Sequence, residues 1–368
     1  MNSKFMKVIN ENIVFLPFFF IFILLSALYS HEIVHYSDFV DWQTIVTLAG
    51  LLIITTAIKE SAYFSIVAEK ILKKANTERK VALLLILLSC ILSSFLTNDI
   101  ALFIVVPLTL SFRRFIGSSM GKLIVFEAIA VNVGSALTPI GNPQNLFLWH
   151  QWDVSFLTFV MKMLPLFVLL FALLIIFVLI IFPSKKLSAH SNQEKIKFGR
   201  KLFLLSILLL AGYVIIIQFG LAYYALPVVF LVYLAFYRNI LPKVDWLLIL
   251  LFVTIFVDFH LISRMQIILN FVNLYDLNSH TTVFSLSILF SQITSNVPAS
   301  IFMSKFSHNW LSIAYGVNVG GNGTVIASLA NIIALRFAGG KKIWMDFHKY
   351  SLLYLIVTGG LAYAVFFL

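Results

Sequence analysis

Charged residues are scarce in this sequence: Asp, Glu, Lys and Arg make up 11% of its 368 residues, against roughly 25% in a soluble domain. So little charge cannot cover a globule in water, which excludes an ordinary soluble enzyme and a disordered chain. Cysteine is nearly absent. The single Cys90 lies in an apolar run and matches no metal-ligand spacing, so we expect a small core residue, without disulfide or redox chemistry.

Apolar side chains are abundant instead, at 61% of the residues with a mean hydropathy of +1.00. A helix needs about 20 apolar residues to cross the hydrocarbon core of a bilayer. We therefore predict an all-α polytopic membrane protein with about nine full crossings. The nine apolar runs are residues 13–29, 42–58, 123–149, 156–182, 202–219, 222–237, 246–262, 311–337 and 347–368.

Two further apolar stretches, residues 81–112 and 281–304, are each interrupted by a polar tripeptide. The first is flanked by basic residues, with Arg79 before it and Arg113 after it. Because basic residues mark the cytoplasmic side, both ends lie there. Its arms, of about 16 and 14 residues, reach about 24 and 21 Å as helix, which is too short to cross. Both stretches are therefore predicted to be re-entrant hairpins.

The basic residues also predict the orientation. With a cytoplasmic N-terminus, all of the 26 Lys and Arg residues except Lys162, Arg264 and Lys305 fall on the cytoplasmic side. This is the bias that membrane insertion demands, so the net charge of +11 calls for no nucleic-acid partner. We expect a multi-pass protein of the cytoplasmic membrane with its C-terminus outside.

An internal repeat is visible in the sequence. Residues 131–134, Val-Asn-Val-Gly, recur as residues 317–320. Identities that follow without gaps are the pairs Thr138 and Thr324, Ile140 and Ile326, and Asn145 and Asn331. Upstream landmarks recur in the same order, Asp41-Trp42 as Asp245-Trp246 and Asn98 as Asn296. Self-similarity over this length indicates two related halves.

We predict a first repeat at residues 1–182, a cytoplasmic loop and linking helix at 183–219, and a second repeat at 220–368. Each half has two crossings, an amphipathic stretch, a hairpin, an interrupted helix and a closing helix. The single linking helix inverts the second half. Inverted repeats with broken elements in matching positions are typical of secondary transporters, whose binding site lies near the midplane of the membrane.

Regular backbone is predicted to break at four places within the membrane. The breaks are Thr97-Asn98-Asp99 and Thr294-Ser295-Asn296 in the hairpins, and residues 138–143 and 320–324 in the interrupted helices. Prolines end the helix at the third break, where Asn142 before Pro143 is expected to cap the next helix. Free helix N-termini attract anions, while unwound carbonyls, hydroxyls and amides suit a hard cation such as sodium.

These breaks supply the candidate substrate- and ion-binding residues. They are Thr97, Asn98, Asp99, Asn132, Gly134, Thr138, Asn142, Asn145, Thr294, Ser295, Asn296, Asn318, Gly320, Gly321, Asn322 and Thr324, with Asn98, Asp99 and Asn296 as candidate sodium ligands. An alternative is that the buried amides only tie helices together. Asp99, the one acidic residue predicted near the bilayer centre, could bind a cation, carry a proton or cap the returning arm.

The positions of two other acidic residues indicate that they lie at the membrane interface. Glu127 lies within two turns of Lys122 near a cytoplasmic helix end, which predicts interface pairing. Asp258 lies near an outer helix end, which likewise favours the interface. Neither is expected to contact substrate.

Four segments carry a resemblance to a known family: FLTNDIALFIVVPLT, NVGSALTPIGNPQNLFLW, TSNVPAS and NVGGNGTVIASLAN. The chain resembles the ion transporter superfamily, which includes arsenite permeases, citrate and divalent-anion:sodium symporters and some sodium/proton antiporters. Within it, the chain is most similar to short bacterial inner-membrane transporters of the YbiR type. The resemblance implies an elevator-like movement of hairpins and broken helices, and several members are homodimers.

The resemblance also implies roles for the hairpin tips. In the anion:sodium symporters a Ser-Asn-Thr tip helps to bind sodium and substrate, which marks Asn98 and Asn296 here. The present tips read Thr-Asn-Asp and Ser-Asn-Val. The added acid and the missing hydroxyl are more like the arsenite and sodium/proton branches.

The sequence therefore predicts an ion-coupled secondary active transporter of a small anion, driven by sodium or protons in symport or antiport. The alternative is a cation/proton antiporter with Asp99 as the titrating group, and a non-transporting receptor is the third reading. No Ser/His/Asp set, paired carboxylates or phosphate loop is present, so we expect no enzyme, no cofactor beyond sodium ions and no direct use of ATP.

Overall fold

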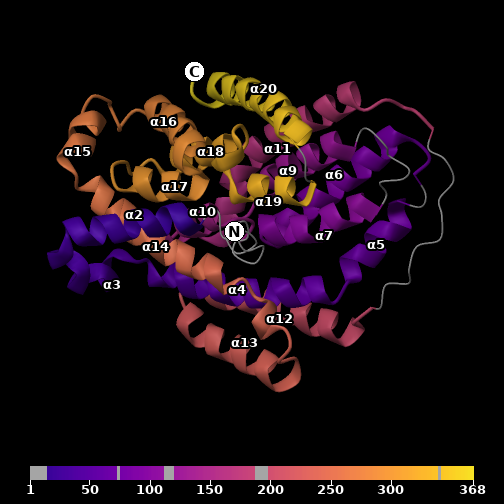
Figure 1. Ribbon diagram of the computed structural model, residues 1–368, viewed down its shortest axis with the longest axis horizontal. Helices are drawn as coiled ribbons and strands as arrows, with labels where there is room; N and C mark the ends of the chain where they lie inside the picture. Colours follow the sequence, from indigo (N-terminus) through magenta and orange to yellow (C-terminus); the bar gives the residue numbers. More distant parts are fainter. Residues whose placement is uncertain (1–14, 73–74, 112–119, 187–197, 339–340) are drawn as a thin grey trace, which may run out of the picture.

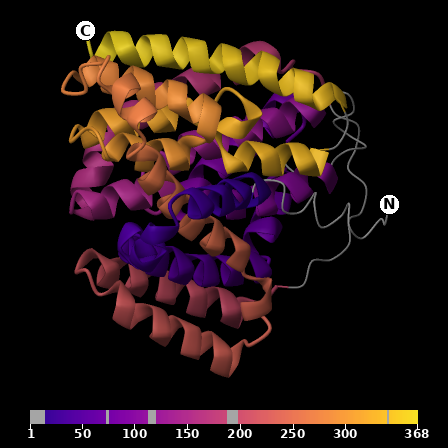
Figure 2. The ribbon, with the colours of Figure 1, turned by 60° about the vertical axis from the view of Figure 1, so that its left-hand side comes forward.

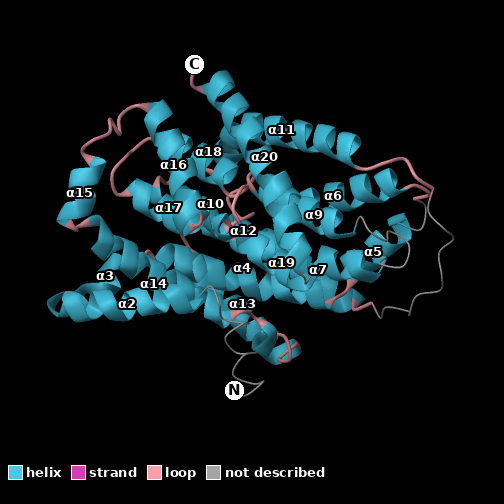
Figure 3. Cartoon of the chain, turned by 45° about the horizontal axis from the view of Figure 1, so that its top comes forward, coloured by secondary structure: helices cyan, strands magenta, loops and turns pink. Residues whose placement is uncertain are grey.

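The structure, a computed structural model, describes residues 15–72, 75–111, 120–186, 198–338 and 341–368. Within these ranges the protein is helical throughout, which confirms the all-α fold class (Figure 3). Their only strand-like pairing is an isolated bridge between Thr77 and Lys186. Arg113 and the loop at 187–197, which helped to set the predicted orientation, lie outside the described residues.

The described residues of the first half of the chain form α-helices and one short 3-10 helix. Its elements are α2 (Phe15–Leu28), η1 (Ser30–His35), α3 (Tyr36–Phe39), α4 (Trp42–Glu60), α5 (Tyr63–Leu72), α6 (Glu78–Phe95), α7 (Asn98–Ser111), α9 (Met120–Ser135), α10 (Pro143–Gln151) and α11 (Phe156–Ile181). Asp41 caps α4 by accepting a hydrogen bond from the Thr44 amide at 3.2 Å. Only two residues separate α6 from α7, which pack against each other as the predicted hairpin.

The second half of the chain has a similar order of elements after the linking helix α12. Its elements are α12 (Arg200–Gln218), α13 (Ala222–Phe236), η3 (Leu241–Lys243), α14 (Trp246–Ser263), α15 (Gln266–Val272), α16 (His280–Thr294), α17 (Asn296–Ser304), α18 (Trp310–Gly320), η4 (Val325–Ala327), α19 (Leu329–Ala338) and α20 (Lys341–Phe366). Asp245 caps α14 through the Leu248 amide at 3.1 Å, as Asp41 caps α4. The second hairpin, α16 and α17, is again a packed pair.

Several helices have the length and composition to cross a membrane. Among the described residues these are α4, α11, α12, α14 and residues 343–366 of α20, and α2 with the segment after it, bent by 112°, makes a sixth. The runs 123–149 and 311–337 are each two shorter helices around a break, as the sequence predicts. The chain is thus a multi-pass membrane protein, and the total of nine crossings stays a prediction.

The helices form layers around the broken elements. Helices α12 and α13 pack on α4 at one edge and α20 packs with α11 at the opposite edge (Figures 1 and 2). In the apolar window of α4, 78% of the residues are buried, against 17% in α12. Because lipid matches an apolar surface, α12 belongs to the lipid-facing layer and α4 to the interior.

One glycine in each interrupted helix allows that helix to pack closely against its hairpin. A Cβ on Gly134 of α9 would lie 2.2 Å from the Cys90 carbonyl oxygen of α6. A Cβ on Gly320 of α18 would lie 2.7 Å from the Ser291 Cβ of α16. These predicted site residues therefore allow close packing of helix backbones, as small residues do in membrane interfaces.

Candidate functional site

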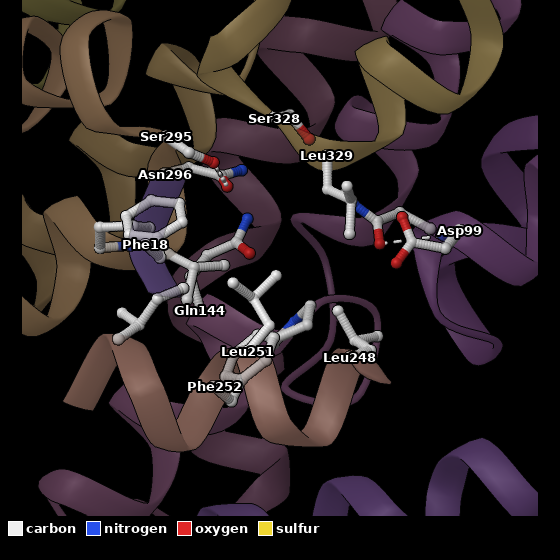
Figure 4. Close-up of a pocket in the computed structure, with 15 residues that line it drawn as sticks. Phe18, Asp99, Gln144, Leu248, Leu251, Phe252, Ser295, Asn296, Ser328 and Leu329 are labelled. Atoms are coloured by element: carbon white, nitrogen blue, oxygen red, sulfur yellow. Dashed lines mark hydrogen bonds between the residues drawn. The ribbon is translucent and has the colours of Figure 1, made fainter. Parts of the chain in front are cut away.

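A small cavity of about 40 Å³ lies where the hairpin tips meet the breaks of the interrupted helices (Figure 4). Its polar lining residues are Asn98, Asp99, Gln144, Ser295, Asn296 and Ser328. Helices α2 and α14 form an apolar wall. The wall residues are Phe18, Leu248, Leu251, Phe252 and Ile255. No Lys, Arg or His is among the described residues that line the cavity.

Four helix N-termini meet at this cavity. The lining includes residues at the starts of α7, α10, α17 and α19. The sequence builds the α10 start through Asn142, whose side chain accepts from the Asn145 amide at 2.8 Å ahead of Pro143 at the first helical position. That cap confirms the prediction from the sequence. Unpaired amides and helix dipoles make such ends favourable for negative charge.

The first hairpin tip places a carboxyl group in the cavity. Asp99, in the first turn of α7, is 6% exposed, and its Oδ1 has no hydrogen-bond partner among the described residues. The backbone N–H of Asn98 donates to the Gly141 carbonyl at 3.0 Å, which ties this tip to the break of the first interrupted helix. Asp99 and Asn296 lie at opposite sides of the cavity (Figure 4). The cavity therefore joins elements from both halves of the chain.

The second hairpin tip is held in an unusual backbone conformation. Ser295 has a backbone φ of 88°, a conformation that residues other than glycine rarely adopt. Holding a residue in it costs about 1–3 kcal/mol. Ser295 directly precedes Asn296, which is 3% exposed. A Cβ on Gly321 would lie 2.9 Å from the Asn296 Nδ2, so a glycine there leaves room for the amide. Strain of this kind is found where the surrounding structure fixes a functional geometry.

Beside the cavity, two asparagine clusters link the interrupted helices. Asn132 Nδ2 donates to Asn331 Oδ1 at 2.9 Å and to the Gly321 carbonyl at 3.1 Å. Asn318 Nδ2 donates to Asn145 Oδ1 at 2.7 Å. The amides thus satisfy the backbone of the breaks, which cannot reach water at this depth.

Hydroxyl groups attach each break to its hairpin. Thr138 Oγ1 donates to the Ser94 carbonyl at 2.5 Å, and Thr324 Oγ1 donates to the Gln292 carbonyl at 3.1 Å. Ser94 and Gln292 in turn donate to the backbone of the adjacent interrupted helix, at 2.9 and 2.6 Å. Each hairpin and its interrupted helix are therefore joined by paired hydrogen bonds.

Four of the predicted site residues line the cavity: Asn98, Asp99, Ser295 and Asn296. The other twelve lie outside its lining, most of them in the hydrogen-bond network or in helix packing, whereas the side chains of Thr97 and Asn322 are buried without a hydrogen-bond partner among the described residues. The twelve are Thr97, Asn132, Gly134, Thr138, Asn142, Asn145, Thr294, Asn318, Gly320, Gly321, Asn322 and Thr324. Thr294 donates to its own helix at Phe290, at 3.0 Å.

Two polar residues of the lining, Ser328 and Gln144, and the apolar wall were missed by the sequence reasoning. Extending the ungapped alignment of the repeats pairs Ser328 with Asn142, so its position was available as a helix start. Its hydroxyl donates to Asn132 Oδ1 at 3.0 Å. Gln144 follows Pro143 in the first turn of α10, where side chains of a cavity-facing helix start are expected.

The expected pairing of Glu127 with Lys122 is wrong, and Asp258 is covered by neighbouring helices. Glu127 is 0% exposed, and its carboxylate accepts a hydrogen bond from Thr109 of α7 and not from Lys122. Asp258 is also 0% exposed, and neither of its oxygens has a partner among the described residues. Hydropathy alone gave an approximate depth and could not give the direction of the side chain.

A multi-pass bundle whose polar cavity is built from broken helices is the architecture of a membrane transporter. The chain belongs to the citrate transporter family CitMHS, which it matches over residues 6–310. It is 36% identical over 313 residues to the inner membrane protein YbiR of Escherichia coli K12, covering 85% of this chain and 84% of that protein. This confirms the resemblance inferred from the four segments.

Further relatives are named as transporters. The uncharacterized transporter MJ0456 of Methanocaldococcus jannaschii is 37% identical over 341 residues, which cover 90% of this chain and 91% of that one. The putative transporter arsB of Dictyostelium discoideum is 24% identical over 156 residues, covering 42% of this chain and 28% of that protein. The protein is therefore a membrane transporter of the citrate and arsenite permease type.

Proposed function

We propose that this protein is a secondary active transporter that moves a small anion through the cavity between the hairpin tips, coupled to sodium or protons. The convergence of four helix N-termini on one buried cavity carries the proposal. Without a lining Lys, Arg or His among the described residues, the amides and dipoles supply the attraction for an anion. A site without fixed cations can also release its anion, as transport requires.

Asp99 explains why transport would be coupled. Its carboxyl group stands in the first turn of α7, inside the same cavity. A carboxylate there repels an anion and occupies the positive end of the helix. Neutralising it with a proton or a sodium ion removes that repulsion, so anion and cation bind together more favourably than either alone.

Matching contacts support an inverted repeat. The alignment that pairs Asn132 with Asn318 and Asn145 with Asn331 also exchanges the two cross-helix hydrogen bonds. Two related elements that contact each other reciprocally are expected around a two-fold axis. An axis in the membrane plane is the arrangement of inverted repeats in secondary transporters. An elevator-like movement of the hairpins against the apolar wall fits this arrangement.

Flux measurements in proteoliposomes test the proposal. Uptake of labelled citrate, succinate, phosphate, sulfate and arsenite is followed under imposed sodium and proton gradients. We expect gradient-driven uptake of at least one anion, reduced at least tenfold by Asn98→Ala and by Asn296→Ala. Asn273→Ala, an exposed asparagine outside the cavity, is the matched control. Normal uptake in both cavity variants would contradict the proposal.

A second candidate is a sodium/proton antiporter. It is favoured by one observation: Asp99 is the only charged side chain among the described residues that line the cavity. In this case Asp99→Asn abolishes the alkalinisation or acidification of vesicles after sodium addition, with no anion moved. A sodium response that survives the substitution excludes this candidate.

A further inference from the structure

Asp258 is the most isolated acidic group in the described part of the chain. It lies within the membrane-spanning helix α14, is 0% exposed, and has no hydrogen-bond partner on either carboxyl oxygen. Buried polar groups are paired in the large majority of cases, so this one needs an explanation. An unpaired carboxylate in such a place costs several kcal/mol, and the group avoids that cost by binding a cation.

The fold itself has no need of an acid at this position. The repeat that pairs Asp41-Trp42 with Asp245-Trp246 pairs Asp258 with Ile54 of α4. Ile54 is also 0% exposed, so an aliphatic side chain packs well at the corresponding place in the first half. A structural role shared by both halves therefore cannot account for the carboxyl group.

The position of Asp258 connects it with the cavity. Leu251 and Ile255 of α14 line the cavity. Asp258 follows Ile255 by three residues, and spacings of three and four keep side chains on one face of a helix. It lies about one turn beyond Ile255, about 5 Å along the helix axis. A change at Asp258 thus acts on the helix that forms the apolar wall of the cavity.

The elements around α14 offer Asp258 no counter-charge. Helices α2, α3, α4, α15 and α17 pack against α14, and Phe147 of α10 contacts Phe256 with ring centroids 5.5 Å apart. The ionisable groups on these elements and on the ends of α14 are Tyr36, Asp38, Asp41, Lys59, Glu60, His150, Asp245, His260, Arg264 and Lys305. Among the described residues none of them hydrogen-bonds to Asp258, and each lies within about a turn of a helix end.

We propose that Asp258 is a buried proton-binding site, distinct from Asp99, about one turn beyond the cavity on the helix that forms its apolar wall. A proton satisfies a lone carboxyl group with one ligand, whereas a hard metal cation needs several oxygen ligands around it. No group of three or more His, Cys, Asp or Glu that could hold a metal occurs among the described residues. The proton binding stands independently of the proposed anion transport.

Infrared difference spectroscopy of the reconstituted protein tests the proposal, because a protonated carboxyl group has a carbonyl stretch that the carboxylate lacks. Spectra are recorded from acid to alkaline pH for the wild type, Asp258→Asn and Asp258→Ile. The isoleucine variant copies the residue of the matching position in the first half, so it is expected to fold even if the asparagine variant does not. Asp99→Asn and Glu127→Gln are the matched controls.

We expect one titrating carboxylic-acid band of the wild type to be lost in every folded Asp258 variant and kept in both controls. An unchanged set of acid bands in the folded isoleucine variant would overturn the proposal. No transported substrate is present in this measurement. Its failure is therefore distinguishable from failure of the transport hypothesis, which the flux of the Asn98 and Asn296 variants decides.

Discussion

The two asparagine clusters predict similar losses of stability when Asn132 and Asn318 are each replaced by alanine. Asn132 makes three hydrogen bonds to the second interrupted helix: it donates to Gly321 and Asn331 at 3.1 and 2.9 Å and accepts from Ser328 at 3.0 Å. Its alanine variant loses all three.

Asn318 makes two such bonds: it donates to Asn145 at 2.7 Å and accepts from Asn142 at 3.1 Å, while its bond to Ala314 at 2.8 Å stays within its own helix. A hydrogen bond between helices in a membrane contributes about 0.6 kcal/mol on average, so the three bonds of Asn132 predict a loss of about 2 kcal/mol and the two of Asn318 a loss of about 1 kcal/mol. The amide partners left unpaired add to each loss.

Reversible unfolding in mixed micelles, followed by circular dichroism, measures the two losses. Ser285→Ala is the control, because this exposed hydroxyl bonds only to its own helix, at Thr281, 2.8 Å away. We expect it to change the free energy of unfolding by less than about 0.5 kcal/mol. A loss of about 2 kcal/mol in one asparagine variant with none in the other would refute the equivalence of the clusters.

Three further substitutions follow from the same contacts, each measured by thermal unfolding in detergent. Gly134→Ala places a Cβ 2.2 Å from a backbone oxygen and should cost about 1–3 kcal/mol, whereas Gly212→Ala, with nothing within 4 Å, should be neutral or stabilising. Equal stabilities would contradict this packing argument. Asn142→Ala removes the α10 cap and should cost about 1 kcal/mol or more, so an unchanged midpoint would count against the cap. Thr109→Val removes the hydroxyl donor of Glu127 and should cost about 1–3 kcal/mol. Adding Glu127→Ile, which copies Ile313 of the other half, should recover most of that loss, and no recovery would argue against an unpaired carboxyl as the cause.

Much of the fold could be predicted from the sequence because the residues that begin and end its helices act locally. Pro139 and the glycines near residue 321 fall between helices and Pro143 begins one, and the structure has the two interrupted helices at those places. The Asn142 cap follows from the same local chemistry. The first hairpin followed from its arm length and flanking charge, and the second from its polar tripeptide and its place in the repeat.

The site was only partly predictable because it depends on side-chain direction. Asn98 and Asn296 were found from their tips, but Gln144 and Ser328 complete the cavity from helix starts that carry no strong motif. Asp258 lies near a helix end in sequence, yet neighbouring helices cover it fully. Only the packing of distant elements decides which side of a helix meets lipid and which meets the interior.

The first hairpin is fastened at both of its ends, and this limits how the cavity can open. At its base, the Arg79 Nε donates to the Phe182 carbonyl at 2.8 Å, next to the Thr77 and Lys186 bridge. At its tip, the Asn98 amide is bonded to the opposing backbone. The tip therefore cannot swing as a separate flap: the hairpin, the interrupted helix and α11 would travel as one block. Such a block would slide along the apolar side chains that α2 and α14 contribute to the cavity, and none of these lining side chains can form a hydrogen bond with it.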